Sequence, residues 1–163
     1  MSSAATVEFS ETITFEVPAP YAFDFLADPA TATVIDPAVR DYRPDALPMR
    51  LGTRNTIRLR MWGVPLRATS VVKEWQPGAV MVMENERPAR PVRVAAHHRF
   101  VPTGPERCTY EWRIAVTPTG PFGSLAARLL ARFMRSNATA QQARFKAEVE
   151  RRWQARSTDE AKP

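Results

Sequence analysis

The sequence predicts an α+β domain in which a strongly curved antiparallel sheet of about seven strands wraps around one long C-terminal helix. Three observations support this prediction. An alternating strand pattern opens the chain, a series of short segments separated by prolines and glycines follows, and a long helical pattern at 121–153 closes it. The expected order is therefore one strand, two short helices, a meander of further strands and a helix.

Local patterns predict the first three elements. Apolar and polar side chains alternate from residue 7 to 17, which is the period of a half-buried strand. A proline ends this strand, and residues 21–27 carry the i,i+4 apolar pairs of a short helix. The Asp28-Pro29 pair is typical of a cap followed by a first-turn proline, so we expect a second short helix that ends before Pro37.

The middle of the chain is divided by most of its 15 prolines and six glycines. The segments between them are rich in β-branched, methionine and aromatic residues, and such regular spacing predicts consecutive antiparallel strands. We place these strands at 39–44, 53–61, 66–75, 79–86, 92–101 and 107–117.

The last hairpin allows a prediction of register. Its two strands share an apolar face if Phe100 lies opposite Cys108, with residues 103–105 as the loop. A slip by one residue would pair apolar with polar side chains throughout. This register places His98 on the inner face, opposite Tyr110.

The C-terminal segment reads as an amphipathic helix that begins near Pro121. Its apolar face carries Phe122, Leu125, Ala126, Leu129, Leu130 and Phe133, and its opposite face carries Arg128, Arg132 and Arg135. We expect the apolar face to pack on the sheet. Farther along, Phe145, Val149 and Trp153 fall on another side of the helix, so we expect a kink or a change of packing partner at 137–140.

Length and composition indicate one domain. With 163 residues, the chain is long enough for a substantial core, and we place the domain at 7–154 between disordered ends at 1–6 and 155–163. The single cysteine, Cys108, excludes an internal disulfide and fits a reducing compartment. We find no signal peptide or long apolar run, so a cytoplasmic location is expected.

The net charge of +6 raises the question of nucleic-acid binding. The arginines are scattered over every segment, and many alternate with apolar residues as on the solvated face of a strand. No helix-turn-helix, zinc-finger or aromatic-interleaved basic motif is present, so specific nucleic-acid binding is not expected. Weak contact with an anionic membrane surface is equally compatible with the charge, and the oligomeric state stays open.

Several local matches, in the same order as the predicted elements, carry a family resemblance over nearly the whole chain. They are ITFEVPAPYAFDFLADP at 13–29, Gly52-Thr53-Arg54, Lys73-Glu74-Trp75 before Pro77-Gly78, RCTYEW at 107–112 and Pro118-Thr119-Gly120. With them the chain resembles the helix-grip proteins of the START-like superfamily (SRPBCC, Bet v 1-like), which includes the polyketide cyclase/dehydrase and lipid transport family. Members often carry a tryptophan in the second short helix, where this chain has residues 33–37 without one. The cavity entrance is therefore expected to differ.

The resemblance implies a cavity for a hydrophobic or amphipathic small molecule between the sheet and the terminal helix. It also implies no metal or nucleotide cofactor, as in most members. The superfamily contains both enzymes and carriers, and no short motif separates them. Our leading hypothesis is binding, possibly transport, of a lipid or polyketide-like compound. The alternatives are an aromatase/cyclase-like enzyme and a structural or stress-related domain whose core is filled by its own side chains.

Candidate catalytic residues are few. His98 next to Tyr110 could act as a general acid or base on a bound carbonyl compound, or it could be a hydrogen-bonded wall residue. Glu11 interrupts the apolar face of the first strand and could be a general base in the cavity, unless local twist turns it to solvent. His97 and His98 are adjacent on a strand and point to opposite faces, so they cannot chelate one metal ion. Cys108 lacks a recognisable partner for nucleophilic catalysis.

The predicted ligand-binding residues are the inward positions of the strands and of the terminal helix. They are Asn55, Ile57, Leu59, Ser70, Met81, Met83, Asn85, His98, Tyr110, Trp112, Leu130, Phe133 and Asn137. Apolar members would supply affinity through burial, and the polar members would orient the ligand.

Overall fold

The computed structural model describes residues 5–160, with the side chain of Glu160 left out. The elements are β1 Val7–Phe15, α1 Ala19–Ala27, η1 Pro29–Thr31, α2 Ala32–Ile35, β2 Val39–Pro44, β3 Arg54–Met61, β4 Val64–Gln76, β5 Val80–Arg87, β6 Val92–Gly104, β7 Arg107–Pro118 and α3 Gly123–Glu160. The predicted order of elements is confirmed, and the six predicted middle strands agree with β2 to β7 to within three residues at each end.

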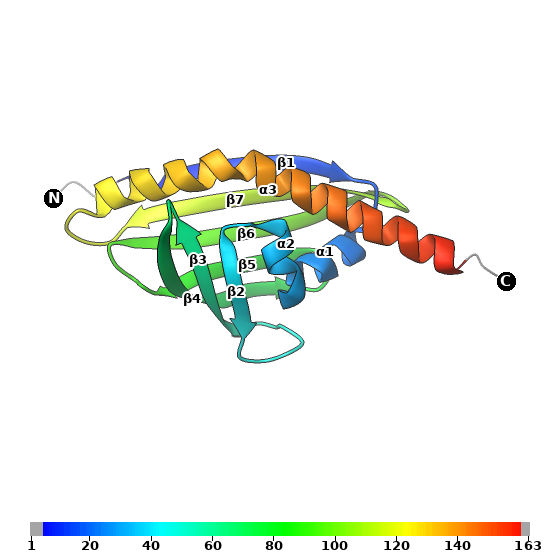
Figure 1. Ribbon diagram of the computed structural model, residues 1–163, viewed down its shortest axis with the longest axis horizontal. Helices are drawn as coiled ribbons and strands as arrows, with labels where there is room; N and C mark the ends of the chain where they lie inside the picture. Colours follow the sequence, from blue (N-terminus) through cyan, green and yellow to red (C-terminus); the bar gives the residue numbers. More distant parts are fainter. Residues whose placement is uncertain (1–4, 161–163) are drawn as a thin grey trace.

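All seven strands form one antiparallel sheet in the order β1-β7-β6-β5-β4-β3-β2. In Figure 1, α3 runs along the β1 and β7 side of this curved sheet, and the short helices α1 and α2 lie beside the C-terminal half of α3. The observed architecture is the predicted α+β helix-grip arrangement. The edge strands of the sheet are β1 and β2, and the meander runs from β2 at one edge to β7, which pairs with β1 at the other.

One face of the sheet, called the inner face below, packs against the helices. The pairing places Glu11, Trp112, His98 and Met81 in one row across four neighbouring strands on this face. Because side chains alternate along a strand, His97 lies on the opposite, outer face. The predicted inward and outward assignments of the two histidines are confirmed.

The β6–β7 register differs from the prediction by two residues. Phe100 pairs with Tyr110, and Pro102 pairs with Cys108. The strands continue to a tighter turn at residues 105–106, with a register irregularity between Pro102 and Gly104. A shift by two preserves the face of every side chain, so the inward set was right although the opposing partners were wrong.

α3 packs on the sheet through small side chains rather than through the predicted large apolar face. Ala127, Ala131 and Ala138 are buried, whereas Leu125 and Leu129 are exposed. Alanine lets the helix approach β1 and β7 closely, and at about 100° per residue the two leucines lie on the opposite side of the helix. The expected packing of the large apolar face is therefore wrong for Phe122, Leu125 and Leu129, whereas Ala126 and Leu130 are partly buried against the core as predicted.

The predicted kink at 137–140 is absent, because α3 is one continuous helix of 38 residues (Figure 1). The buried alanines, Phe145 and Val149 form a single stripe along its core side. The shift of the apolar pattern along the sequence therefore reflects two different faces of one continuous helix, and not a break in the helix. The helix also continues through Glu160, so residues 155–160 are helical rather than a disordered tail. Of the remaining predicted disorder, residues 5–6 are described without helix or strand, and 1–4 and 161–163 lie outside the described residues.

The start of α3 is fixed by a turn. The Gly123 N–H donates to the Gly120 carbonyl at 2.9 Å, and Phe122 between them has φ of 63°. A Cβ at Gly123 would lie 2.8 Å from the Pro91 carbonyl oxygen, so only glycine allows this close approach. The helix consequently begins two residues after the predicted proline start.

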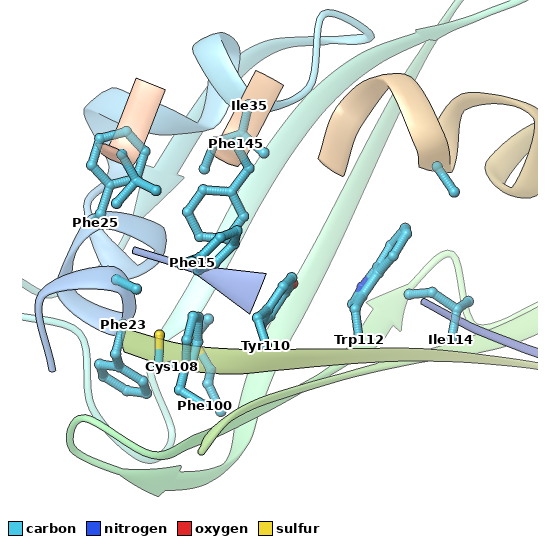
Figure 2. Close-up of a cluster of buried hydrophobic side chains, with 14 of the residues drawn as sticks. Phe15, Phe23, Phe25, Ile35, Phe100, Cys108, Tyr110, Trp112, Ile114 and Phe145 are labelled. Carbon is cyan, nitrogen blue, oxygen red and sulfur yellow. The ribbon is translucent and has the colours of Figure 1, made fainter. Parts of the chain in front are cut away.

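An aromatic core fills the space between α1, the C-terminal half of α3 and the adjoining strands (Figure 2). The Phe145 ring lies 4.8 Å from Phe15, 5.3 Å from Tyr110 and 5.7 Å from Phe25, measured between centroids. Phe100 stacks on Tyr110 at 4.7 Å. This end of the inner face is closed by packed rings.

Candidate functional site

The predicted lining residues of the strands all lie on the inner face. On β3, β4 and β5 the register places Asn55 opposite Ser70, and Ser70 opposite Asn85. The same face carries Ile57 and Leu59, which follow Asn55 by two and four residues along β3. The alternation seen in the sequence therefore identified this surface, and its role in ligand binding stays a prediction.

The inner face is more accessible at the β3–β4 end than under α3. Ile57 and Leu59 are only half-buried, and Leu66 opposite Leu59 is 37% exposed. α3 packs on β1, β7 and β6, while the β3–β4 hairpin meets it at the tip, where the Trp62 ring lies 5.3 Å from Phe133. Solvent thus reaches apolar side chains on the concave side of the sheet.

His98 and Tyr110 form the polar centre of the inner face. The His98 Nδ1 and the Tyr110 hydroxyl are 2.7 Å apart, and both side chains are buried. Burial lowers the pKa of His98 to about 3, with a smaller contribution from His97, so the ring is neutral at physiological pH. Burial also raises the pKa of Tyr110, and a hydrogen bond with Gln142 on α3 only partly opposes the rise.

These contacts suggest one arrangement of protons. Gln142 lowers the pKa of Tyr110, as an amide N–H directed at the Tyr110 oxygen would, and among the described residues the Gln142 Oε1 has no partner. We therefore assign the Tyr110 proton to the hydrogen bond with His98 Nδ1. A neutral His98 then carries its own proton on Nε2, and this atom is buried without a partner. The His98 imidazole is therefore a hydrogen-bond donor through Nε2 and a poor base near neutral pH.

Two more buried polar atoms on the same face have no partner among residues 5–160, namely the Asn55 Oδ1 and the Ser70 Oγ. The Asn55 amide nitrogen contacts only the Met83 sulfur, at 3.8 Å, and the Tyr42 hydroxyl contacts the same sulfur at 3.5 Å. Sulfur is a weak acceptor, so these groups are poorly satisfied. Burying unpaired polar atoms costs free energy, which a ligand with matching groups would recover.

Two predicted polar anchors are already engaged by the backbone. The Asn85 amide donates to the Pro88 carbonyl, and its oxygen accepts from the Val94 N–H at 2.6 Å. The Asn137 amide donates to the Phe133 carbonyl one turn earlier, at 3.1 Å. Both amides therefore stabilise local structure, and of their polar atoms only the Asn137 oxygen lacks a hydrogen bond within the described chain.

The other predicted lining residues divide between the two ends of the inner face. Met81 and Trp112 are buried in the core cluster, whereas Leu130 and Phe133 are partly buried on the flank of α3. Glu11 lies on the edge strand β1 opposite Trp112 and is half-buried. The predicted lining is therefore only partly accessible to a ligand.

The outer face carries a hollow of about 430 Å³, bordered by His97, Arg99, Glu111 and Arg113. The pKa of His97 there is lowered, chiefly by partial burial and also by Arg113. Cys108 is buried, and burial raises the pKa of its thiol to about 11. Within residues 5–160, no group of three or more histidine, cysteine or acidic side chains could hold a metal ion.

Sequence reasoning missed Gln142 and Tyr42. Gln142 is spaced four residues after Ala138 and three before Phe145, so it occupies the buried stripe of α3. The alanines of this stripe were overlooked beside the larger leucine and phenylalanine pattern. Tyr42 pairs with Ile57 and shares its inner face, which an extension of the alternation to β2 would have identified.

The comparisons with known proteins agree with this geometry. The sequence matches the family described as polyketide cyclase / dehydrase and lipid transport over residues 6–150. The chain belongs to this family. The START-like (SRPBCC, Bet v 1-like) superfamily resemblance is thereby confirmed, and its fold is typical of hydrophobic-ligand binding or of aromatase/cyclase activity. No curated protein matches the sequence at a significant level.

Solved structures of low sequence identity share the fold. The Zhui aromatase/cyclase from Streptomyces sp. R1128 is 18% identical, with a TM-score of 0.76 over 91% of this chain and 96% of that chain. A START superfamily protein from Mycobacterium smegmatis is 14% identical, with a TM-score of 0.67 over 86% and 97%. Ara h 8.0201 is 13% identical, with a TM-score of 0.65 over 90% and 96%.

Proposed function

We propose that the protein binds a hydrophobic or aromatic small molecule, such as a lipid or polyketide-like compound, on the concave inner face between β2–β5 and α3. One observation carries the proposal. Within the described chain, Asn55, Ser70 and His98 on the inner face and Gln142 on α3 each hold a buried polar atom without a partner, among mostly apolar neighbours. A ligand that presents an apolar body and a few polar groups would satisfy both features.

The accessible side chains indicate where the ligand would lie. Ile57, Leu59 and Met83 are half-buried on the inner face, and Phe133 and Met134 are half-buried on α3, where Phe133 contacts Trp62 at the tip of the β3–β4 hairpin. Removing such apolar area from water supplies affinity at about 25 cal/mol per Å². The neutral His98 would orient the ligand by donating from Nε2 to an oxygen, provided that a small rearrangement opens its surroundings.

The test is titration with an uncharged apolar fluorescent probe, N-phenyl-1-naphthylamine, on wild type and two matched variants. Ile57→Arg places a charge on the inner face and should abolish binding. Thr56→Arg, at the neighbouring half-buried position on the outer face, should leave binding unchanged. Equal loss in both variants, or no binding by the wild type, would overturn the proposal in favour of a filled core. Native mass spectrometry of the purified protein would identify co-purifying lipid.

A second candidate function is aromatase/cyclase-like catalysis, which the His98–Tyr110 hydrogen bond favours. A neutral imidazole donor could polarise a ketone oxygen of a bound β-polyketone, and the apolar face would restrict the conformers of the chain. The lowered pKa of His98 argues against a role as general base in the free protein. Conversion of a short β-polyketone that His98→Gln or Tyr110→Phe abolishes without loss of folding would establish this activity. Unchanged probe binding without turnover would leave the carrier function.

A further inference from the structure

The N-terminal part of α3 and the turn residue before it present large apolar side chains to solvent. Phe122, in the turn, is 83% exposed, and Leu125 and Leu129 on the helix are 60% and 45% exposed. The two leucines lie on the side of the helix opposite the buried alanines, where a surface helix normally carries polar residues. Contiguous exposed apolar groups of this size mark an interaction surface.

The tip of the β3–β4 hairpin extends this surface. Trp62 is 60% exposed, and its ring contacts Phe133 on the flank of α3 next to Leu129. Among the described residues other than glycine, only Trp62 and Phe122 have positive φ, at 48° and 63°. The two most exposed aromatic rings of the described chain thus stand on left-handed turn positions, which are unfavourable for bulky residues and are enriched at functional sites. We call Trp62, Phe122, Leu125 and Leu129 the apolar ridge.

A row of arginines borders the apolar ridge. Arg128, Arg132 and Arg135 line a hollow of about 480 Å³ between α3 and β1. Arg135 lies over the Phe9 ring at 5.5 Å and reaches the Glu8 carbonyl, and none of the three takes part in an ion pair within residues 5–160. Their charges are therefore available to a partner.

The two stretches of sequence that form the ridge and the arginine row contain no carboxylate. The stretch 112–147, which includes the arginine row, contains no aspartate or glutamate, and neither does 46–73, which includes the hairpin. A second copy of this surface would therefore bring arginines together without a counter-charge. The complementary partner is a negatively charged surface that also accepts apolar side chains.

We propose that the apolar ridge and the arginine row dock the protein on an anionic phospholipid bilayer. The ridge would enter the boundary between headgroups and acyl chains, where tryptophan is favoured, and the arginines would contact lipid phosphates. No helix within the described chain is long and apolar enough to cross a membrane, so this contact is peripheral. The inference does not depend on a ligand at the inner face.

The test is sedimentation of the full chain with phosphatidylcholine vesicles, with and without phosphatidylglycerol. Wild type should bind only the anionic vesicles, less at high salt. Replacing Arg128, Arg132 and Arg135 together by glutamine should weaken binding on the order of 100-fold. A control that removes three exposed cations elsewhere, namely Arg50, Lys73 and Arg144, should weaken it far less.

A second pair of matched variants tests the contribution of the apolar ridge to vesicle binding. Leu125→Ser with Leu129→Ser should weaken vesicle binding at least about tenfold. Leu47→Ser with Leu51→Ser, which removes two exposed leucines in the β2–β3 loop, should not. The blue shift of tryptophan emission on anionic vesicles should be reduced in Trp62→Phe.

Three outcomes would overturn the proposal. One is no binding of the wild type to anionic vesicles, and another is an equal loss in the ridge variants and their controls. The third is a dimer in analytical ultracentrifugation that Leu125→Ser with Leu129→Ser dissociates, which would assign the ridge to a second copy. Circular dichroism of every variant should match that of the wild type, because all the substituted residues are exposed.

Discussion

At one end of the inner face, side chains of β1, β6 and β7 are buried in aromatic rings against α1 and α3. At the other end, Ile57, Leu59 and Leu66 on β3 and β4 keep contact with solvent. Phe145 is 1% exposed and touches four other rings. Ile57 is half-buried, and the exposed Trp62 alone joins its hairpin to α3 by a ring contact within the described chain.

The difference separates the part of the sheet that carries the packed core from the part where ligand binding is proposed. The closed end supplies most of the buried apolar area, because its rings come from α1, three strands and α3. The open end carries Asn55 and Ser70, whose polar atoms are unpaired, and lining that a ligand could cover. Regions that bind ligands are commonly drawn from the less stable parts of a protein.

The largest expected effect on stability comes from truncating one large apolar side chain to alanine at each end of the inner face. Phe145→Ala should lower the free energy of unfolding by about 3–5 kcal/mol, because it leaves a cavity between packed rings. Ile57→Ala should cost only about 1 kcal/mol, because its site is partly hydrated already. Urea denaturation measures both values. Similar losses at the two ends would remove the distinction between them.

The second effect is a pH dependence that originates at the boundary between the ends. The pKa of His98 is lowered from 6.5 to about 3 in the folded state. The unfolded chain therefore takes up a proton as the pH falls through 6.5, while the folded state does not. The stability associated with neutral His98 is complete above the unfolded pKa and should fall by about 1.4 kcal/mol for each pH unit below it.

The control for this pH dependence is His98→Gln, which retains a hydrogen-bonding side chain beside Tyr110 but does not titrate. Other groups, including His97 and the carboxylates, titrate in both proteins, so the difference between the two stability curves isolates His98. Parallel curves between pH 4 and 7 would contradict the burial of a neutral imidazole.

The third effect tests which side of α3 faces the sheet. Ala131→Leu should lower the free energy of unfolding by about 1–3 kcal/mol, because the larger side chain cannot fit between α3 and the strands. Leu129→Ala, two residues away on the exposed side, should change it by no more than about 0.5 kcal/mol. Thermal unfolding of both variants provides the measurement. A larger loss for Leu129→Ala would restore the packing that the sequence pattern suggested.

The sheet could be predicted from the sequence because its side chains alternate with a period of two. An error of two residues at Phe100 left His98 and Tyr110 on the correct face, since only an odd shift exchanges the faces. Prolines and glycines marked the strand ends by local sterics. These signals do not depend on what lies across the interior, which explains their reliability.

The packing face of α3 and the contacts of the candidate site depend on residues far away in the sequence, which local patterns do not specify. Leucine and phenylalanine dominate the pattern of 122–133, yet Ala127 and Ala131 decide the packing because they allow close approach to β1 and β7. The sequence likewise placed Asn55 inward, but it could not reveal that the Asn55 oxygen lacks a partner or that Gln142 reaches Tyr110. Such contacts arise between elements far apart in the chain.

The smallest expected effect concerns the single ring contact that ties the open end to α3. Trp62→Ala removes the contact with Phe133 and should lower the free energy of unfolding by about 0.5–1.5 kcal/mol. Amide hydrogen exchange should accelerate near the tip of β3 and β4, because the hairpin loses its anchor on the helix. Val64→Ala, an exposed truncation on the same hairpin without a ring contact, serves as the control. Faster exchange in β6 and β7 as well would mean that the two ends unfold together, and the closed end would then not be independent of the open one.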